Sequence, residues 1–161
     1  MKFKIATLVF IKNSKGEHLL IKRLKAPNLG KWSPVGGKLA TEEGESPFEC
    51  AIRETREETG LDLEEKDLHL YGYISEKDYE GSGHWLMFMF DCLKPMDELP
   101  PSNEEGRFDF FSRDQIDEIE IPPSDHTLIW PFYDKHKNGF AALRAECDPA
   151  QQLKLIVEET F

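Results

Sequence analysis

The strongest constraint on the fold of this chain is one sharply delimited helix signal between Ser46 and Gly60. Ser46 can cap a helix, Pro47 suits its first position, and Glu49, three residues after the cap, completes a capping box. Gly60 supplies a stop, because glycine readily adopts the left-handed conformation that ends helices. The sequence therefore predicts a helix that runs from Pro47 to Thr59.

Three glutamates follow one edge of this predicted helix. At about 100° per residue, Glu54, Glu57 and Glu58 fall within about 100° of one another. Like charges at these spacings repel, and the helix C-terminus nearby disfavours anions. A divalent cation would relieve the repulsion, and such oxygen ligands suit Mg²⁺ or Mn²⁺. The alternative interpretation is a solvated charged face, in which Arg53 pairs with Glu57.

Strand patterns flank this helix in the chain. Before it, segments 3–12 and 18–24 are typical of two strands joined by a turn at 13–16. After it, we expect strands at 68–76, 84–92, 108–111 and 140–145, a hairpin tip at 79–83, a loop at 96–106, a helical turn at 113–118 and a helix at 125–137. This order predicts an α+β fold in which helices cover a mixed sheet, with residues 1–161 as one domain.

Charge and composition exclude several classes of function. The net charge is −11, and so acidic a surface repels a long phosphate backbone, which argues against sequence-independent binding to nucleic acid. No apolar run reaches the roughly 20 residues of a membrane span, and the N-terminus shows no signal-peptide cleavage pattern. Three scattered cysteines are typical of small buried residues in a reducing compartment. We expect a cytoplasmic protein without a membrane partner; its oligomeric state stays open.

The segment from Gly37 to Leu61 resembles the Nudix box, G-x5-E-x7-R-E-U-x-E-E-x-G-U, in which U is a bulky aliphatic residue. Seven residues separate Glu45 from Arg53, as the pattern requires, and the charged residues that follow match it. Two positions depart from the pattern. Seven residues rather than five separate Gly37 from Glu45, which we expect to bulge the loop at 40–43, and Thr55 replaces the aliphatic residue. The resemblance to this family implies an α/β/α sandwich with a central mixed sheet.

The same resemblance implies an enzyme that hydrolyses a nucleoside diphosphate linked to another group, with Mg²⁺ or Mn²⁺ and a small nucleotide as its partners. By position in the motif, Glu57 and Glu58 match the principal metal ligands. Glu54 matches a further ligand or the base that orients water, and the Gly37 carbonyl matches a backbone ligand. Arg53 matches the residue that holds the catalytic glutamates in place.

Two further glutamate positions follow from the resemblance. Glu45 matches the outer glutamate of the box, whose role stays open. In the family, a downstream glutamate often completes the metal site or acts as the base. Glu105 is the first candidate for this role and Glu104 the second, and a solvated loop charge is the alternative for both.

The C-terminal part suggests a substrate. Segment 122–132 resembles MutT-type diphosphatases that act on oxidised purine nucleoside triphosphates. In those enzymes an acidic residue of this region reads the purine edge, and Asp125 takes that position; a cap for the following helix is the alternative. Ser33 stands where such relatives have an asparagine that contacts the base. The resemblance implies cleavage of a nucleoside triphosphate, including an oxidised one, to the monophosphate and pyrophosphate.

Several other residues have two interpretations. Arg23 and Lys38 are candidates for phosphate contacts or are exposed charges, and Trp32 lines the base pocket or packs. The pair His84-Trp85 indicates strand packing. Tyr79, 18 residues beyond the box, has a spacing associated with diadenosine polyphosphate hydrolases. Hydrolysis of ADP-ribose and a non-catalytic nucleotide-binding module are further alternatives, but the three glutamates together favour an enzyme.

Overall fold

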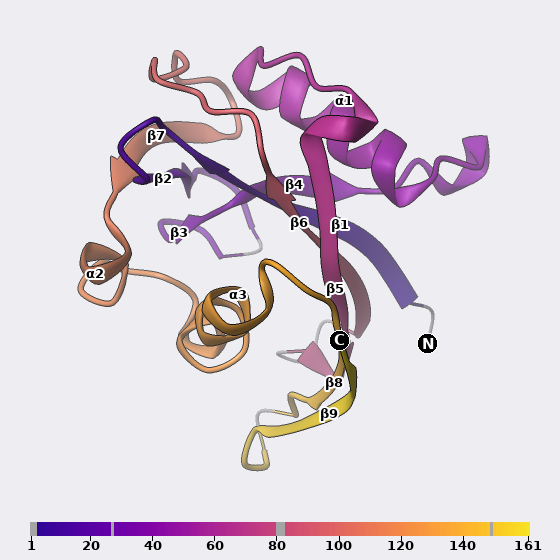
Figure 1. Cartoon of the computed structure of the whole chain (residues 1–161). Helices are drawn as coiled ribbons and strands as arrows, with labels where there is room; N and C mark the ends of the chain where they lie inside the picture. Colours follow the sequence, from indigo (N-terminus) through magenta and orange to yellow (C-terminus); the bar gives the residue numbers. More distant parts are fainter. Residues whose placement is uncertain (1–2, 27, 80–82, 149) are drawn as a thin grey trace.

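The fold is built on one mixed sheet (Figure 1). The computed structural model describes residues 3–26, 28–79, 83–148 and 150–161, and the strands of this part are β1 (Phe3–Lys12), β2 (His18–Arg23), β3 (Trp32–Ser33), β4 (Val35–Lys38), β5 (Leu68–Lys77), β6 (His84–Cys92), β7 (Gly106–Phe111), β8 (Ala141–Glu146) and β9 (Lys154–Thr160). Their order is β3-β2-β1-β6-β5-β8-β9, with β4 paired to β1 and β7 to β2. The pairs β1–β6 and β5–β8 are parallel, and the others are antiparallel.

Each face of the sheet carries its own hydrophobic core. Along β1, Val9 and Ile11 belong to the core that includes Ala51 of α1 (Pro47–Thr59). Phe10 belongs to the opposite core, together with residues of α2 (Arg113–Ile116) and α3 (Trp130–His136). Successive residues of a strand point to opposite faces, so a strand covered on both sides is apolar throughout. Figure 1 shows α1 on one side of the sheet and α2 and α3 on the other, which confirms the expected α/β/α sandwich.

Helix α1 begins and ends at the predicted residues. Ser46 Oγ accepts a hydrogen bond from the Glu49 amide at 3.2 Å, and the Glu49 carboxylate accepts one from the Ser46 amide at 3.1 Å. Gly60 follows the helix with a φ of 78°, in the left-handed region that glycine favours. Its N–H donates to the Arg56 carbonyl at 2.9 Å. The local signals therefore fix the helix that carries the glutamates.

Strand β1 divides its pairing between two strands, and this places β4 next to α1. Residues 6–9 of β1 pair with β4, whereas Ile11 and Lys12 pair with β2. Gly36 allows the close approach, since a Cβ there would collide with the Thr7 carbonyl. The connection from β4 to α1 contains a 3₁₀ helix, η1 (Thr41–Glu43), followed by Gly44 with a φ of 70°. The extra residues of the box thus form one compact turn.

The C-terminal half differs from the predictions in one helix. The helix expected at 125–137 is divided into a 3₁₀ helix, η4 (Pro123–His126), and α3. Pro131 in the first turn of α3 has no N–H to donate to the Thr127 carbonyl, as a continuous helix would require. The prediction of one helix over this range was therefore wrong.

Strands β3, β4 and β9 were not predicted, because each is short or lies at the edge of the sheet. A further 3₁₀ helix, η2 (Glu65–Asp67), precedes β5. The hairpin tip expected at 79–83 falls partly outside the described residues. Within the described ranges, no helix is long and apolar enough to cross a membrane. The three cysteines are free thiols, two of them buried and Cys147 half-buried.

Candidate active site

Arg53 is the centre of the polar contacts along the glutamate edge of α1. Its Nε and Nη2 donate to the two carboxylate oxygens of Glu45, at 2.7 and 2.9 Å. Its Nη1 donates to Glu54 Oε1 at 3.0 Å and to Glu57 Oε2 at 3.2 Å. A further bond from Nη2 reaches the Lys38 carbonyl of β4 at 3.1 Å. One guanidinium therefore holds three glutamates and a strand in fixed relation.

Glu45 occupies this place despite the longer loop before it. Its carboxylate also accepts the Ala40 N–H at 3.0 Å, and its side chain is only 10% exposed. The hydrogen bond from Arg53 lowers the pKa of Glu45 to about 2. Glu45 is therefore an ionised partner of Arg53, and the turn η1 absorbs the two extra residues without disturbing this pair.

The three glutamates of α1, which the helical spacing placed along one edge, differ in burial. Glu58 is buried, the side chain of Glu54 is 16% exposed and that of Glu57 is 57% exposed. The reason is that Glu58 faces β4, where the Gly36 N–H donates to its Oε2 at 3.3 Å. Burial, and next the charge of Glu54, raise the pKa of Glu58 to about 8. Burial likewise raises the pKa of Glu54.

Gly37 provides space for one of these carboxylates. A Cβ at Gly37 would collide with the carboxylate of Glu54, so the glycine leaves room for the carboxylate in this position. Both Glu54 and Glu58 are thus carboxylates held close to the β4 backbone with little water around them. A divalent cation would favour their ionised forms, and oxygen atoms are the ligands that Mg²⁺ and Mn²⁺ prefer. The residues present therefore fit such a cation.

The carboxylates do not form a closed metal cage. Among the residues that the structure describes, no group of three or more His, Cys, Asp or Glu side chains is arranged to hold a metal ion. Mg²⁺ usually binds through one or two carboxylates and takes its remaining ligands from water and substrate phosphates. The open arrangement beside α1 is compatible with this mode of binding.

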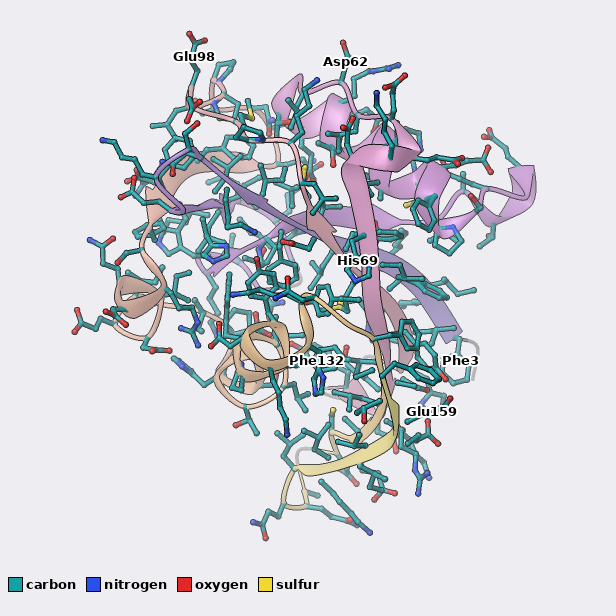
Figure 2. The ribbon with its side chains drawn as sticks, viewed as in Figure 1. Phe3, Asp62, His69, Glu98, Phe132 and Glu159 are labelled. Atoms are coloured by element: carbon teal, nitrogen blue, oxygen red, sulfur yellow. The ribbon has the colours of Figure 1, made fainter. Side chains whose placement is uncertain are left out.

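Of the two downstream glutamates, Glu105 lies toward this edge and Glu104 is exposed. The charge of Glu105 contributes, after burial as the main cause, to the raised pKa values of Glu54 and Glu58. Its carbonyl accepts the Leu24 N–H at 2.9 Å, which attaches the loop to the end of β2. Glu98 of the same loop projects away from the sheet (Figure 2). The geometry favours Glu105 over Glu104.

A cavity of about 160 Å³ adjoins this edge on the side of η4. It extends from Gly36 and Gly37 of β4 to residues of β5, β6 and η4. Its charged and polar lining residues are Thr7, Arg23, Asn28, Ser33, Lys38, Glu76 and Asp125, and its aromatic ones are Tyr79 and Trp85. The structure therefore brings three of the four predicted substrate-binding residues, Arg23, Lys38 and Asp125, to one cavity.

Trp32 does not belong to this group. The described residues that line the cavity do not include it, and its ring packs edge-on against Phe111 with centroids 4.8 Å apart. The Arg107 guanidinium lies 5.0 Å from the Trp32 ring centroid. The structure shows the packing of Trp32 and does not place it in this cavity. Trp85, expected to pack in its strand, packs with Ala6 and Tyr79 and also lines the cavity.

Asp125 is buried in the lining and does not cap a helix. In the described part of the chain, the N-caps of η4 and α3 are Pro122 and Ile129, and neither makes a side-chain cap hydrogen bond. The helix-cap interpretation of Asp125 was therefore wrong. A buried carboxylate in the lining of a cavity is a candidate for contact with a ligand.

Sequence reasoning missed Glu76. This residue of β5 is 3% exposed and lines the cavity with Asp125. Its position in the strand could have revealed it. Side chains alternate between the two faces of a strand, and Ile74, two residues earlier, is fully buried, so Glu76 points to the same buried face. A charge in an inward position is unusual enough to mark a candidate site.

The comparisons with known proteins agree with this geometry. The NUDIX domain family matches residues 2–134. A Bacillus subtilis protein named an uncharacterized Nudix hydrolase, YvcI, is 30% identical over 107 residues, or 66% of each chain. A Methanocaldococcus jannaschii protein named ADP-ribose pyrophosphatase is 32% identical over 121 residues, 75% of this chain and 68% of that one. The matches thus span about two thirds of these relatives' own lengths.

Solved structures show the same fold. The mutator MutT protein of Bacillus halodurans aligns with a TM-score of 0.75 and 24% identity, over 97% of this chain and 98% of its own. The NUDIX domain of Shewanella oneidensis NrtR, solved with ADP ribose, aligns with a TM-score of 0.70 and 13% identity, over 84% of this chain and 88% of its own. Since the family match covers most of the chain and includes the glutamate helix, this protein belongs to the Nudix hydrolase family.

Proposed function

We propose that this protein hydrolyses a purine nucleoside triphosphate, including an oxidised one, to the monophosphate and pyrophosphate with Mg²⁺ or Mn²⁺. The observation that carries the proposal is the continuity of the cavity. It begins at Gly37, against which the Glu54 carboxylate lies, and ends among the buried carboxylates of Glu76 and Asp125. A nucleotide requires both a place for its phosphates and a place for its base.

The edge of α1 supplies the groups for phosphate chemistry. When bound, the divalent cation would neutralise the diphosphate, activate water and stabilise the leaving oxygen. Glu54, Glu57 and Glu58 are the candidate ligands, and Arg53 positions two of them directly. Arg23, which lines the cavity and whose charge acts on Glu58, is placed to contact phosphate oxygens.

The other end of the cavity favours a guanine-type base. A carboxylate accepts hydrogen bonds when ionised and donates one when protonated; in their ionised forms Asp125 and Glu76 would select a ligand edge that carries N–H donors. Guanine offers its ring N–H and its amino group, and an oxidised purine adds another N–H. Adenine offers one amino group beside a ring nitrogen with a lone pair, which a carboxylate repels. The indole of Trp85 provides an apolar wall for either ring.

ADP-ribose is the second candidate substrate. The observation in its favour is the 32% identity to the relative named ADP-ribose pyrophosphatase. Both substrates contain a diphosphate, so the edge of α1 would serve either one. They differ in the base, and the two carboxylates of the cavity count against adenine.

The test is a comparison of GTP, dGTP, 8-oxo-dGTP, ATP, UTP and ADP-ribose as substrates with Mg²⁺, with chromatographic identification of the products. We expect the guanine triphosphates to give the highest kcat/KM, with monophosphate and pyrophosphate as products. Glu57→Gln should lose about 100-fold or more in kcat. Glu118→Gln, an exposed carboxylate just beyond α2, is the matched control and should retain parental activity. Preferential cleavage of ADP-ribose would contradict the proposal.

A further inference from the structure

One side chain, Asn103, links the loop between β6 and β7 to the end of α1. Its Nδ2 donates to the Glu58 carbonyl at 3.0 Å, across 45 residues of sequence. Its Oδ1 accepts the Glu105 N–H at 2.8 Å and the Gly106 N–H at 3.3 Å. The backbones of Asn103 and Gly106 also pair, with N–O distances of 2.9 and 3.2 Å. The loop therefore closes on itself and on α1 through one carboxamide.

These bonds use both halves of the carboxamide. Only the oxygen of an asparagine side chain can accept two N–H groups, and only its nitrogen can donate to a carbonyl. The Glu58 carbonyl belongs to the last turn of α1, where carbonyls have no partner within the helix. The Asn103 Nδ2 supplies a donor to this carbonyl, and the Asn103 Oδ1 fixes the backbone of Glu105 by accepting its N–H.

A second attachment fixes Glu105 from the opposite side. Its carbonyl accepts the N–H of Leu24, which follows Arg23 at the end of β2. Gly106 lies so close to β2 that a Cβ there would collide with the Lys22 carbonyl. The Glu105 side chain is 35% exposed, and Lys25 Nζ lies 3.5 Å from its Oε1. Its backbone is therefore fixed on two sides, whereas its carboxylate is accessible.

We propose that Asn103 is a positioning residue of the active site, which holds Glu105 at a fixed place relative to Glu58 so that the Glu105 carboxylate takes part in cation binding. The inference rests on the proposed function, because it gives Glu105 a role at the same cation site. It adds a residue that touches neither substrate nor cation and acts only through its neighbours.

A purely structural role for Asn103 makes a different prediction. If the carboxamide only closed a turn and capped α1, its loss would lower the free energy of unfolding and leave cation affinity unchanged. Asn13 provides a matched control, because its Oδ1 accepts the Lys15 and Glu17 N–H groups in the turn between β1 and β2, away from α1. Asn13→Ala removes the same chemistry from a turn that holds no carboxylate of the site.

The experiment is a double-mutant cycle on Mn²⁺ binding to the protein without nucleotide, measured by electron paramagnetic resonance of free Mn²⁺. We expect Asn103→Ala and Glu105→Gln each to weaken binding about 10-fold, and the double variant to bind within twofold of Glu105→Gln. Asn13→Ala should bind as the parent does. If Asn103→Ala does not fold, Asn103→Asp, which keeps the acceptor and loses the donor, takes its place in the cycle.

The outcomes separate this inference from the proposed function. Losses that multiply in the double variant, or an unchanged affinity in Asn103→Ala or in Glu105→Gln, would overturn the inference, even if the parent hydrolyses nucleoside triphosphates. Coupled losses in a parent that cleaves none of the nucleotides would support the positioning role and contradict the proposed function. A parent that binds no Mn²⁺ without nucleotide would overturn the inference, whereas the proposed function would still be decided by the hydrolysis assay, in which substrate phosphates supply further ligands.

Discussion

Arg53 and Glu45 form a two-pronged ion pair, with Nε 2.7 Å from Oε2 and Nη2 2.9 Å from Oε1. Two parallel bonds of this kind require the planar fork of a guanidinium, and the remaining nitrogen is left to serve Glu54 and Glu57. Glu45 therefore acts on the edge of α1 through Arg53: it fixes the plane of the guanidinium, and this plane fixes the two carboxylates.

Arg53→Lys should lower kcat for Mg²⁺-dependent hydrolysis by about 10- to 100-fold. An ammonium group cannot make the two parallel bonds to Glu45 and at the same time the bonds to Glu54 and Glu57. Steady-state kinetics and circular dichroism would check this result. The control is Arg56→Lys, since Arg56 pairs with the exposed Asp62, which points away from the sheet (Figure 2). Equal activity in both variants would contradict a positioning role for Arg53.

Cation binding should depend on pH through Glu58. Its pKa of about 8 means that the metal-free carboxyl is mostly protonated at pH 7, so a cation must displace a proton. We expect Mn²⁺ affinity to rise by up to about tenfold per pH unit between pH 6 and pH 8 and to level off above that range. Isothermal titration calorimetry in buffers of different ionisation enthalpy would measure the proton released. In Glu58→Gln, affinity should be lower and this dependence should disappear; a parent with pH-independent affinity would contradict the assignment.

Base recognition should depend on the two buried carboxylates of the cavity. Asp125→Asn and Glu76→Gln replace an acceptor by a group that also donates, at nearly constant size. Each should lower kcat/KM for GTP about 10-fold more than for UTP, which corresponds to one buried hydrogen bond. An equal loss for both nucleotides would show that the residue supports the fold rather than the base. Glu118→Gln again serves as the control for removal of one charge.

The sequence was most informative where the structure is local. The capping box, Gly60 and the glutamates lie within 16 residues of chain, so their spacing alone predicts helix α1 and its charged edge. Burial along that edge was not predictable in detail. Glu58 is buried because β4 lies beside it, and β4 lies there because β1 divides its pairing between two strands.

The cavity shows the limit of sequence reasoning more clearly. Its lining comes from β1, β2, β3, β4, β5, β6 and η4, and the parallel pairing of β1 with β6 brings the later strands beside the earlier ones. The sequence offered Trp32 as a base-pocket residue and assigned Trp85 to strand packing, and only the topology shows that Trp85 lines the cavity. The alternation of side chains along the strand places Glu76 on the buried face, but it does not show which residues or cavity Glu76 faces.

Stability at acid pH should depend on His18, which packs edge-on against Trp130 and Tyr133 with centroids 4.9 and 5.2 Å away. Burial, and next the charge of Lys12, lower the pKa of His18 to about 3. Because the unfolded chain takes up this proton near pH 6.5 and the folded one does not, the free energy of unfolding should fall by about 1.4 kcal/mol per unit as pH decreases from 6.5 toward 3.

Other groups titrate in this range, so the measurement is the difference from His18→Phe, which keeps a flat ring and cannot bind the proton. Urea denaturation at pH 7 and pH 4.5 should show the parent losing about 2 to 3 kcal/mol more than the variant. Parallel losses in the two proteins would mean that His18 is protonated within the fold, and the aromatic packing around it would then have to tolerate a charge.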